Sequence, residues 1–144
     1  MSKIIVLSIK PEFSNRIFNG SKKIELRKSS PKIDNDDIII IYNTMPEKAV
    51  VGICKIKEVI DSTPKEIWNN YSEILGIDEK RYFDYYLGRE KAIGLKIDCF
   101  RRFKDKITLK EIKDFIPDFS PPQTFKYFSR TTIMDSYKWA NSLR

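Results

Sequence analysis

Four consecutive isoleucines occupy positions 38–41 and are followed by Tyr42. An uninterrupted apolar run of this length predicts a strand over residues 37–42 that is buried on both faces. Because neighbouring side chains on a strand point to opposite faces, other elements have to cover both sides of it. The chain therefore needs a sheet with packing partners on each face, which a barrel with flanking helices provides.

The rest of the chain alternates between strand and helix signals. Pro11 suits the first turn of a helix that Gly20 ends, while Thr63 and Thr108 each begin a Thr-x-x-Glu capping box. Gly52 interrupts an apolar run and predicts a bulge or a bend. These signals predict strands over residues 3–9, 22–28, 49–60 and 91–103 and helices over residues 11–19, 63–76, 78–87 and 108–115. The order predicts the α+β class, as a β-barrel of mixed strands with flanking and inserted helices.

One domain accounts for a chain of 144 residues. We expect it to span residues 1–128, followed by a C-terminal tail over residues 129–144 with helical potential near Trp139. Cys54 and Cys99 fall in apolar runs, which predicts reduced cysteines in the core. The sequence has neither a leader segment nor an apolar run long enough to cross a membrane, so we expect a cytoplasmic protein.

The charge balance favours a polyanionic partner. Lys and Arg total 27 against 20 Asp and Glu, a net charge of +7 that attracts nucleic acid, although a solvated basic surface gives the same count. The chain contains no histidine, which excludes Ser-His and Cys-His nucleophile pairs and most zinc sites. We therefore expect no metal and no cofactor, and any chemistry has to use Lys, Glu, Asp, Tyr, Thr or Ser.

Residues 20–27 read Gly-Ser-Lys-Lys-Ile-Glu-Leu-Arg and form the candidate site. Gly20 allows close approach of the backbone, and Lys22 and Arg27 supply a point charge and a planar fork for phosphate oxygens. Glu25 is suited to accept from an exocyclic amine or to hold the two basic groups in place. Strand alternation separates Lys22 from Arg27, so the turn at Gly20 has to re-aim Lys22. The alternative is that Glu25 and Arg27 form an ordinary salt bridge.

Further residues are candidates for the rim of a cleft, each with a structural alternative. Lys10, Lys28 and Arg16 either extend a basic rim or are solvated charges, and Tyr42 either stacks on a base or completes the core. Three candidates for the cleft mouth follow a diproline: Gln123, Thr124 and Tyr127. The alternative for this segment is that the neighbouring phenylalanines pack it onto the core while these polar side chains face water.

Two other groups are more typical of structure than of binding. The aromatic cluster over residues 82–86 has the spacing of helix packing rather than of an RNA platform. The basic run of Arg101, Arg102 and Lys104 is more typical of a solvated strand end than of a phosphate contact.

The motif G-x-K-x-x-E-x-R in residues 20–27 resembles the signature of ASCH domains, a PUA-like family. Residues 7–11, 41–42 and 121–125 are similar to a prokaryotic ASCH subgroup assigned as regulators, so the resemblance covers about residues 3–128. It implies a β-barrel with flanking helices, a cleft beside the motif, and RNA binding, coactivator-linked roles or the processing of modified bases. The favoured function is binding of RNA or a modified nucleotide through a basic cleft built round Gly20, Lys22, Glu25 and Arg27.

The resemblance also leaves enzymatic readings open, with Lys22 and Glu25 as the catalytic residues. Some ASCH members resemble amidohydrolases of acetylated cytidine, which use the motif lysine, a threonine where this chain has Glu25, and a distant glutamate, for which Glu73 or Glu79 is a candidate. The missing threonine counts against this reaction, and we expect the Glu25 carboxylate to raise the pKa of Lys22. In a ribonuclease, Lys22, Arg27 and Tyr42 would stabilise the phosphorane while Glu25 acts as base.

A third reading is a protein-interaction module whose cleft takes an acidic protein partner, which the net charge of +7 also permits. The sequence does not indicate an oligomeric state.

Overall fold

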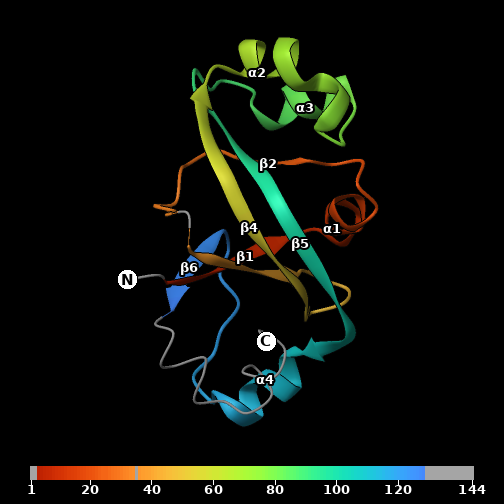
Figure 1. The fold of residues 1–144 in the computed structure, drawn as a ribbon, viewed down its shortest axis with the longest axis vertical. Helices are drawn as coiled ribbons and strands as arrows, with labels where there is room; N and C mark the ends of the chain where they lie inside the picture. Colours follow the sequence, from red (N-terminus) through yellow and green to blue (C-terminus); the bar gives the residue numbers. More distant parts are fainter. Residues whose placement is uncertain (1–2, 35, 129–144) are drawn as a thin grey trace.

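The computed structural model describes residues 3–34 and 36–128 and confirms the α+β class (Figure 1). The tail over residues 129–144, with its expected helix near Trp139, lies outside the described residues. In chain order the elements are β1 (Ile4–Ile9), α1 (Pro11–Phe18), β2 (Ile24–Arg27), β3 (Ile38–Asn43), β4 (Ala49–Ser62), α2 (Pro64–Tyr71), the 3-10 helix η1 (Ser72–Ile74), α3 (Glu79–Tyr85), β5 (Ala92–Thr108), α4 (Leu109–Phe115) and β6 (Phe125–Phe128).

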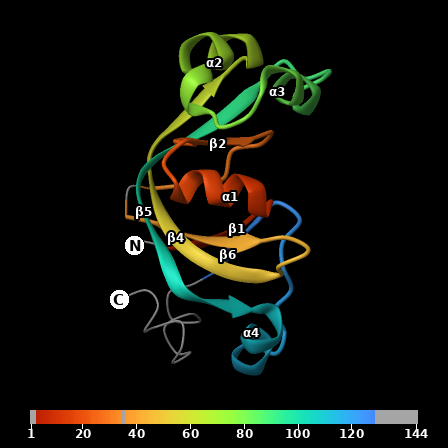
Figure 2. The same cartoon turned by 90° about the vertical axis from the view of Figure 1, so that its right-hand side faces the viewer.

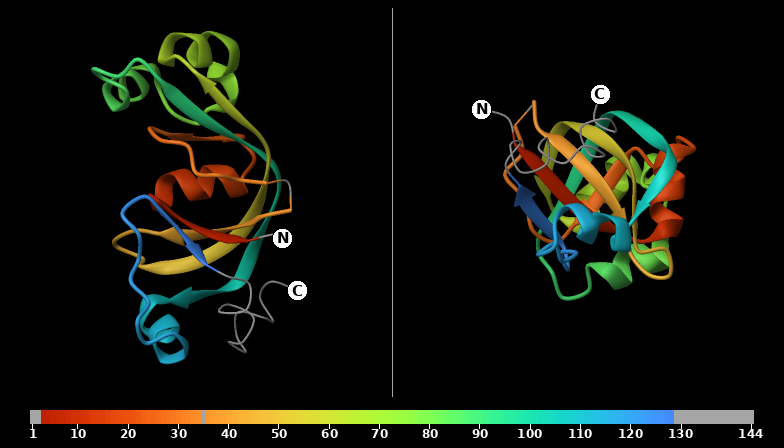
Figure 3. Two further views of the ribbon diagram at one scale, coloured as in Figure 1. Left: turned by 90° about the vertical axis from the view of Figure 1, so that its left-hand side faces the viewer. Right: turned by 90° about the horizontal axis from the view of Figure 1, so that it is seen from below.

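The strands form one mixed sheet in the order β2-β5-β4-β3-β1-β6, curved into a half-barrel. β1 and β3 are parallel, and the other neighbouring strands are antiparallel. The long strands β4 and β5 run through the molecule, with α2 and α3 at one end and α4 at the other (Figure 1). Seen from below, the strands curl around a common centre (Figure 3).

The bulge predicted at Gly52 is present. The register of β4 against β5 shifts between Val50 and Gly52. A Cβ atom at Gly52 would lie 2.5 Å from the carbonyl oxygen of Arg101 and 2.7 Å from the ring of Phe18. Only glycine therefore lets β5 and α1 approach this bend so closely.

The isoleucine run packs on both faces, as its sequence predicts. Ile39 and Ile41 belong to a core cluster that includes Ile17 of α1, whereas Ile40 and Tyr42 belong to a second cluster on the other face. A third cluster joins β2 to α2 and α3 through residues such as Ile24, Leu26, Ile67, Leu75, Tyr82 and Tyr86. Each face of the sheet is therefore anchored by its own helices.

The helices begin at the residues that the capping signals indicate. Thr63 Oγ1 accepts the Glu66 N–H at 3.1 Å at the start of α2, and Thr108 Oγ1 accepts the Glu111 N–H at 3.2 Å at the start of α4. The helix predicted over residues 63–76 is divided into α2 and the 3-10 turn η1. Within the described residues the longest helices have eight residues, and no helix could cross a membrane.

Two expectations about β5 are wrong. The strand continues to Thr108, five residues past its predicted end, because the pairing of Ala49 with Thr108 and of Val50 with Ile107 extends the ladder. Cys54 is buried in the core, whereas Cys99 is exposed, since it lies in a stretch of β5, residues 98–102, whose side chains are all exposed.

Candidate functional site

A side chain rather than a backbone ladder links the two free edges of the half-barrel. β2 and β6 stand at opposite edges of the sheet. The Arg27 guanidinium of β2 donates through Nη2 to the Ser8 carbonyl at 2.9 Å and through Nη1 to the Thr124 carbonyl at 3.4 Å. The Tyr86 hydroxyl in turn donates to the Arg27 carbonyl at 3.0 Å. We call this line of contact between the edges the seam.

A cleft of about 380 Å³ opens at the seam. Figure 2 shows α1 between β2 and β1, with α3 beyond β2, and these elements contribute half of the residues that line the cleft. The volume lies at the lower end of the range for ligand pockets, roughly 300–1,000 Å³. The cleft is lined by Ser8, Ile9, Lys10, Phe13, Lys22, Glu25, Leu26, Arg27, Lys28, Thr44, Ile77, Tyr85, Gln123 and Thr124.

The three charged motif residues converge in this cleft, as the sequence requires if they form a site. Lys22 Nζ lies 4.0 Å from Glu25 Oε1, and Arg27 Nη2 lies 3.2 Å from Glu25 Oε2. All three side chains are less than 10% exposed. Lys22 precedes β2, and the turn at Gly20, with φ of +85°, directs it to the side of Arg27. The predicted re-aiming is therefore present.

Burial lowers the pKa of Lys22. The ammonium donates to the Leu75 carbonyl at 2.7 Å, and desolvation lowers the pKa of Lys22 more than the Glu25 carboxylate raises it; Arg16 and Arg27 lower it further. Glu25 does raise this pKa, but our expectation that the net shift would be upward is wrong, because it ignored the cost of burying the charge. The downward shift weakens that argument against acyl-cytidine hydrolysis, whereas the missing threonine still counts against the reaction.

The cleft carries an excess of positive charge. Of its charged lining residues, Lys10, Lys22, Arg27 and Lys28 are basic and only Glu25 is acidic, so four positive charges face one negative charge. Arg27 Nε is buried and has no hydrogen-bond partner among the described residues. Basic side chains and an unused N–H donor are the groups with which proteins bind anions.

Aromatic rings form part of the cleft wall, and one of them was not anticipated. Tyr82 and Tyr86 are buried, as predicted for the cluster, but Tyr85 is 36% exposed and lines the cleft. The Lys28 ammonium lies 4.7 Å from the centre of the Tyr85 ring, and Lys22 Nζ lies 5.1 Å from that of Phe13. Helical spacing gives no signal for Tyr85, because a residue three positions after Tyr82 falls on the same side of the helix; Tyr85 is exposed at the last position of α3.

The structure places only some of the remaining predicted site residues in the cleft. Lys10, Lys28, Gln123 and Thr124 line the cleft. Tyr42 does not: it is 2% exposed and packs against Phe119 in the core.

Several other candidates also lie outside the cleft lining. Gly20 ends α1 without lining the cleft, and Tyr127 lies in a separate hollow. Arg16 donates to the Gly76 carbonyl at 2.7 Å and does not line the cleft. Glu73 and Glu79 are exposed and likewise do not line it. Within residues 3–34 and 36–128, no three Cys, Asp or Glu side chains cluster as metal ligands would.

The curved mixed sheet, its flanking helices and the charged cleft beside β2 define a PUA-like domain. The model of the ASCH domain family matches residues 7–115, and the chain belongs to this family.

A protein of Zymomonas mobilis described as an ASCH domain-containing ribonuclease is 29% identical over 128 residues, which cover 89% of this chain and 86% of that protein. The crystal structure of ASCH from Zymomonas mobilis has a TM-score of 0.87 at 28% identity and covers 98% of this chain and 95% of that one. The N-terminal domain of Thermococcus gammatolerans McrB, bound to m5C DNA, shares the fold at 11% identity, with a TM-score of 0.57 and 98% coverage of both chains.

Proposed function

We propose that this protein binds RNA by holding one nucleotide of a single strand in the cleft at the seam. The carrying observation is the buried convergence of Lys22, Glu25 and Arg27 on one hollow in which positive charge exceeds negative charge. A bound phosphate group would offset the excess positive charge of the cleft. Its several oxygens can accept hydrogen bonds from an arginine and a lysine at the same time. The relative described as a ribonuclease supports RNA as the source of this phosphate.

The rest of the cleft suits the other parts of a nucleotide. Tyr85 and Phe13 offer ring surfaces for a base, and Gln123 and Thr124 offer polar groups at the mouth. The small volume of the cleft favours one extruded nucleotide over a duplex. Glu25 is available to accept a hydrogen bond from an exocyclic amine and so to distinguish among bases, including modified ones.

Salt dependence tests this proposal. A fluorescein-labelled RNA of eight nucleotides and randomised sequence is titrated with the protein at several salt concentrations. For single strands, each phosphate contact contributes about 0.7 to the slope of log affinity against log salt. Lys22→Met should reduce this slope by about that amount and weaken binding, whereas Lys110→Met, on α4 at the other end of the molecule, should change neither. Equal effects of the two substitutions would contradict the proposal.

Ribonuclease activity is the second candidate, favoured by the lowered pKa of Lys22 and by the description of the Zymomonas mobilis relative. The lowered pKa increases the fraction of Lys22 in the neutral amine form, and that form is suited to take the proton from a ribose 2′-hydroxyl, whose oxygen then attacks the phosphorus and expels the 5′-oxygen, which takes up a proton from water. Arg27 would stabilise the charge that develops on the phosphorane. The products are a 2′,3′-cyclic phosphate and a free 5′-hydroxyl.

Product analysis separates binding from cleavage. Incubation of the randomised RNA with the protein should release cyclic-phosphate ends, and Lys22→Met should abolish that release. RNA in which every ribose lacks the 2′-hydroxyl should bind and remain intact. If the protein binds the RNA but the RNA stays intact after long incubation, the proposed binding function stands and the proposed ribonuclease activity is excluded.

A further inference from the structure

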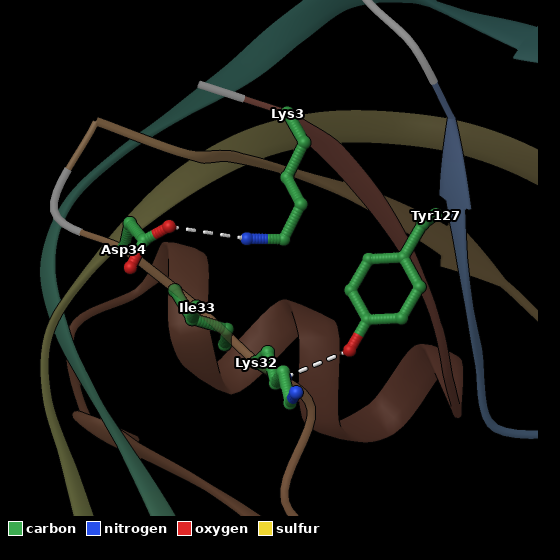
Figure 4. Close-up of a pocket in the computed structure, with 5 residues that line it drawn as sticks. All are labelled: Lys3, Lys32, Ile33, Asp34 and Tyr127. Carbon is green, nitrogen blue, oxygen red and sulfur yellow. Dashed lines mark hydrogen bonds and ion pairs between the residues drawn. The ribbon is translucent and has the colours of Figure 1, made fainter. Parts of the chain in front are cut away.

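A second hollow lies on the same seam, away from the cleft. Figure 4 shows it between the loop that follows β2 and strand β6. Its volume is about 580 Å³, and it is lined by Lys3, Lys32, Ile33, Asp34 and Tyr127. None of these residues lines the cleft.

The same two chain segments connect the hollow to the cleft. Arg27 binds the Thr124 carbonyl at the cleft, and the Lys32 N–H donates to the Tyr127 hydroxyl at 2.7 Å at the hollow. The three steps along the chain from Thr124 to Tyr127 span roughly 10 Å of extended backbone. One strand of nucleic acid can therefore follow the seam from one site to the other.

The charge of the hollow differs from that of the cleft. Lys3 Nζ lies 2.6 Å from Asp37 Oδ2 and 3.4 Å from Asp34 Oδ2, so its charge is already balanced by carboxylates. Such a site attracts a phosphate less than the cleft does, since carboxylates repel it. It offers instead an acceptor in the exposed Asp34 carboxylate and a donor in the Lys3 ammonium.

The hollow also provides a flat aromatic wall. Tyr127 is 42% exposed, and Figure 4 shows its ring facing the hollow opposite Ile33. The hydrogen bond from the Lys32 N–H holds the hydroxyl end of the ring, and the Lys3 ammonium lies 5.8 Å from the ring centre. A ring fixed in this way stacks with a planar partner at little entropic cost.

We propose that the hollow binds the base of a second nucleotide of the RNA strand whose phosphate lies in the cleft. This inference rests on the proposed RNA-binding function and adds to it that the protein binds consecutive nucleotides rather than free mononucleotides. A donor and an acceptor whose charges offset each other, together with an aromatic wall, fit a base, and the exposed side chains of Lys28 and Lys32 flank the path of the backbone between the two sites.

Two probes and two variants test this proposal. The probes are the randomised eight-nucleotide RNA and an equimolar mixture of the four ribonucleoside 5′-monophosphates. Tyr127→Leu should weaken binding of the eight-mer by about tenfold and leave the monophosphates unaffected, because one stacked base is lost. Tyr127→Phe keeps the ring and should bind the eight-mer as the wild type does, apart from a small effect of the lost hydroxyl.

The amide NMR signals of the wild-type protein provide a readout that needs no substitution. The signals of residues 32–34 and of Tyr127 should shift with the eight-mer and not with the monophosphates. Unshifted signals, or an unchanged eight-mer affinity in Tyr127→Leu, would overturn the second site while leaving cleft binding intact. Failure of the wild-type protein to bind either probe would overturn the proposed RNA-binding function together with this inference.

Discussion

Replacing Lys22 with methionine should cost little stability although the side chain is almost fully buried. The ion pair with Glu25 at 4.0 Å contributes about 4 kcal/mol at an effective dielectric constant of 20, and the desolvation of an ammonium opposes it by several kcal/mol. The lowered pKa of Lys22 shows that desolvation prevails. Methionine fills similar space, and Glu25 keeps Arg27 as its partner.

The expected loss is at most about 1 kcal/mol of the free energy of unfolding, mainly from the lost hydrogen bond to the Leu75 carbonyl. A lysine whose charge held the fold together would instead cost about 3–5 kcal/mol on removal. Urea unfolding followed by tryptophan fluorescence measures the difference. A loss above about 3 kcal/mol would refute the reasoning that Lys22 serves the ligand rather than the fold.

The pH dependence of the same measurement provides a second check. Lys22 has a lowered pKa in the folded protein and the ordinary value of 10.5 when unfolded. Between these two values the unfolded chain binds more protons than the folded one, so this group makes the free energy of unfolding rise with pH. The wild-type protein should therefore gain stability relative to Lys22→Met across this window, and a constant difference would contradict the pKa shift.

Three further substitutions probe Arg27 and two residues that contact Lys22 or Arg27 from outside the cleft. Arg27→Ala should destabilise the fold by about 3–5 kcal/mol in urea unfolding, because it leaves Glu25 buried without its nearer partner and opens the seam. Gly76→Ala should lower the melting temperature and weaken RNA binding together, since its φ is +63° and a Cβ would lie 2.5 Å from that of Lys22. Tyr86→Phe should cost about 1 kcal/mol of unfolding free energy through loss of the hydrogen bond to the Arg27 carbonyl, and an unchanged midpoint would contradict that role.

The elements that could be predicted are those whose signals are local. The isoleucine run at 38–41 and the capping threonines Thr63 and Thr108 act through neighbouring residues, and the structure confirms them. The end of β5 could not be predicted, because residues 104–106 are polar and exposed. The ladder resumes only after them, where Ile107 and Thr108 pair with Val50 and Ala49, far away in the sequence.

The candidate site shows the same division. The motif spacing and the turn at Gly20 were enough to predict that Lys22, Glu25 and Arg27 meet. The direction of the Lys22 pKa shift was missed, because the segment that buries this side chain, around Leu75 and Gly76, is more than fifty residues away. Burial of a charge is a property of the folded molecule, and a motif does not contain it.

The pairing of the first strand with the last has a consequence for biosynthesis. Ile4 to Leu7 lie against Phe125 to Phe128, and the Thr124 carbonyl that receives Arg27 belongs to this closing segment. A nascent chain that has reached only α4 carries Lys22, Glu25 and Arg27 but lacks the wall opposite them. The ribosome therefore has to release the chain through β6 before both walls of the cleft can form.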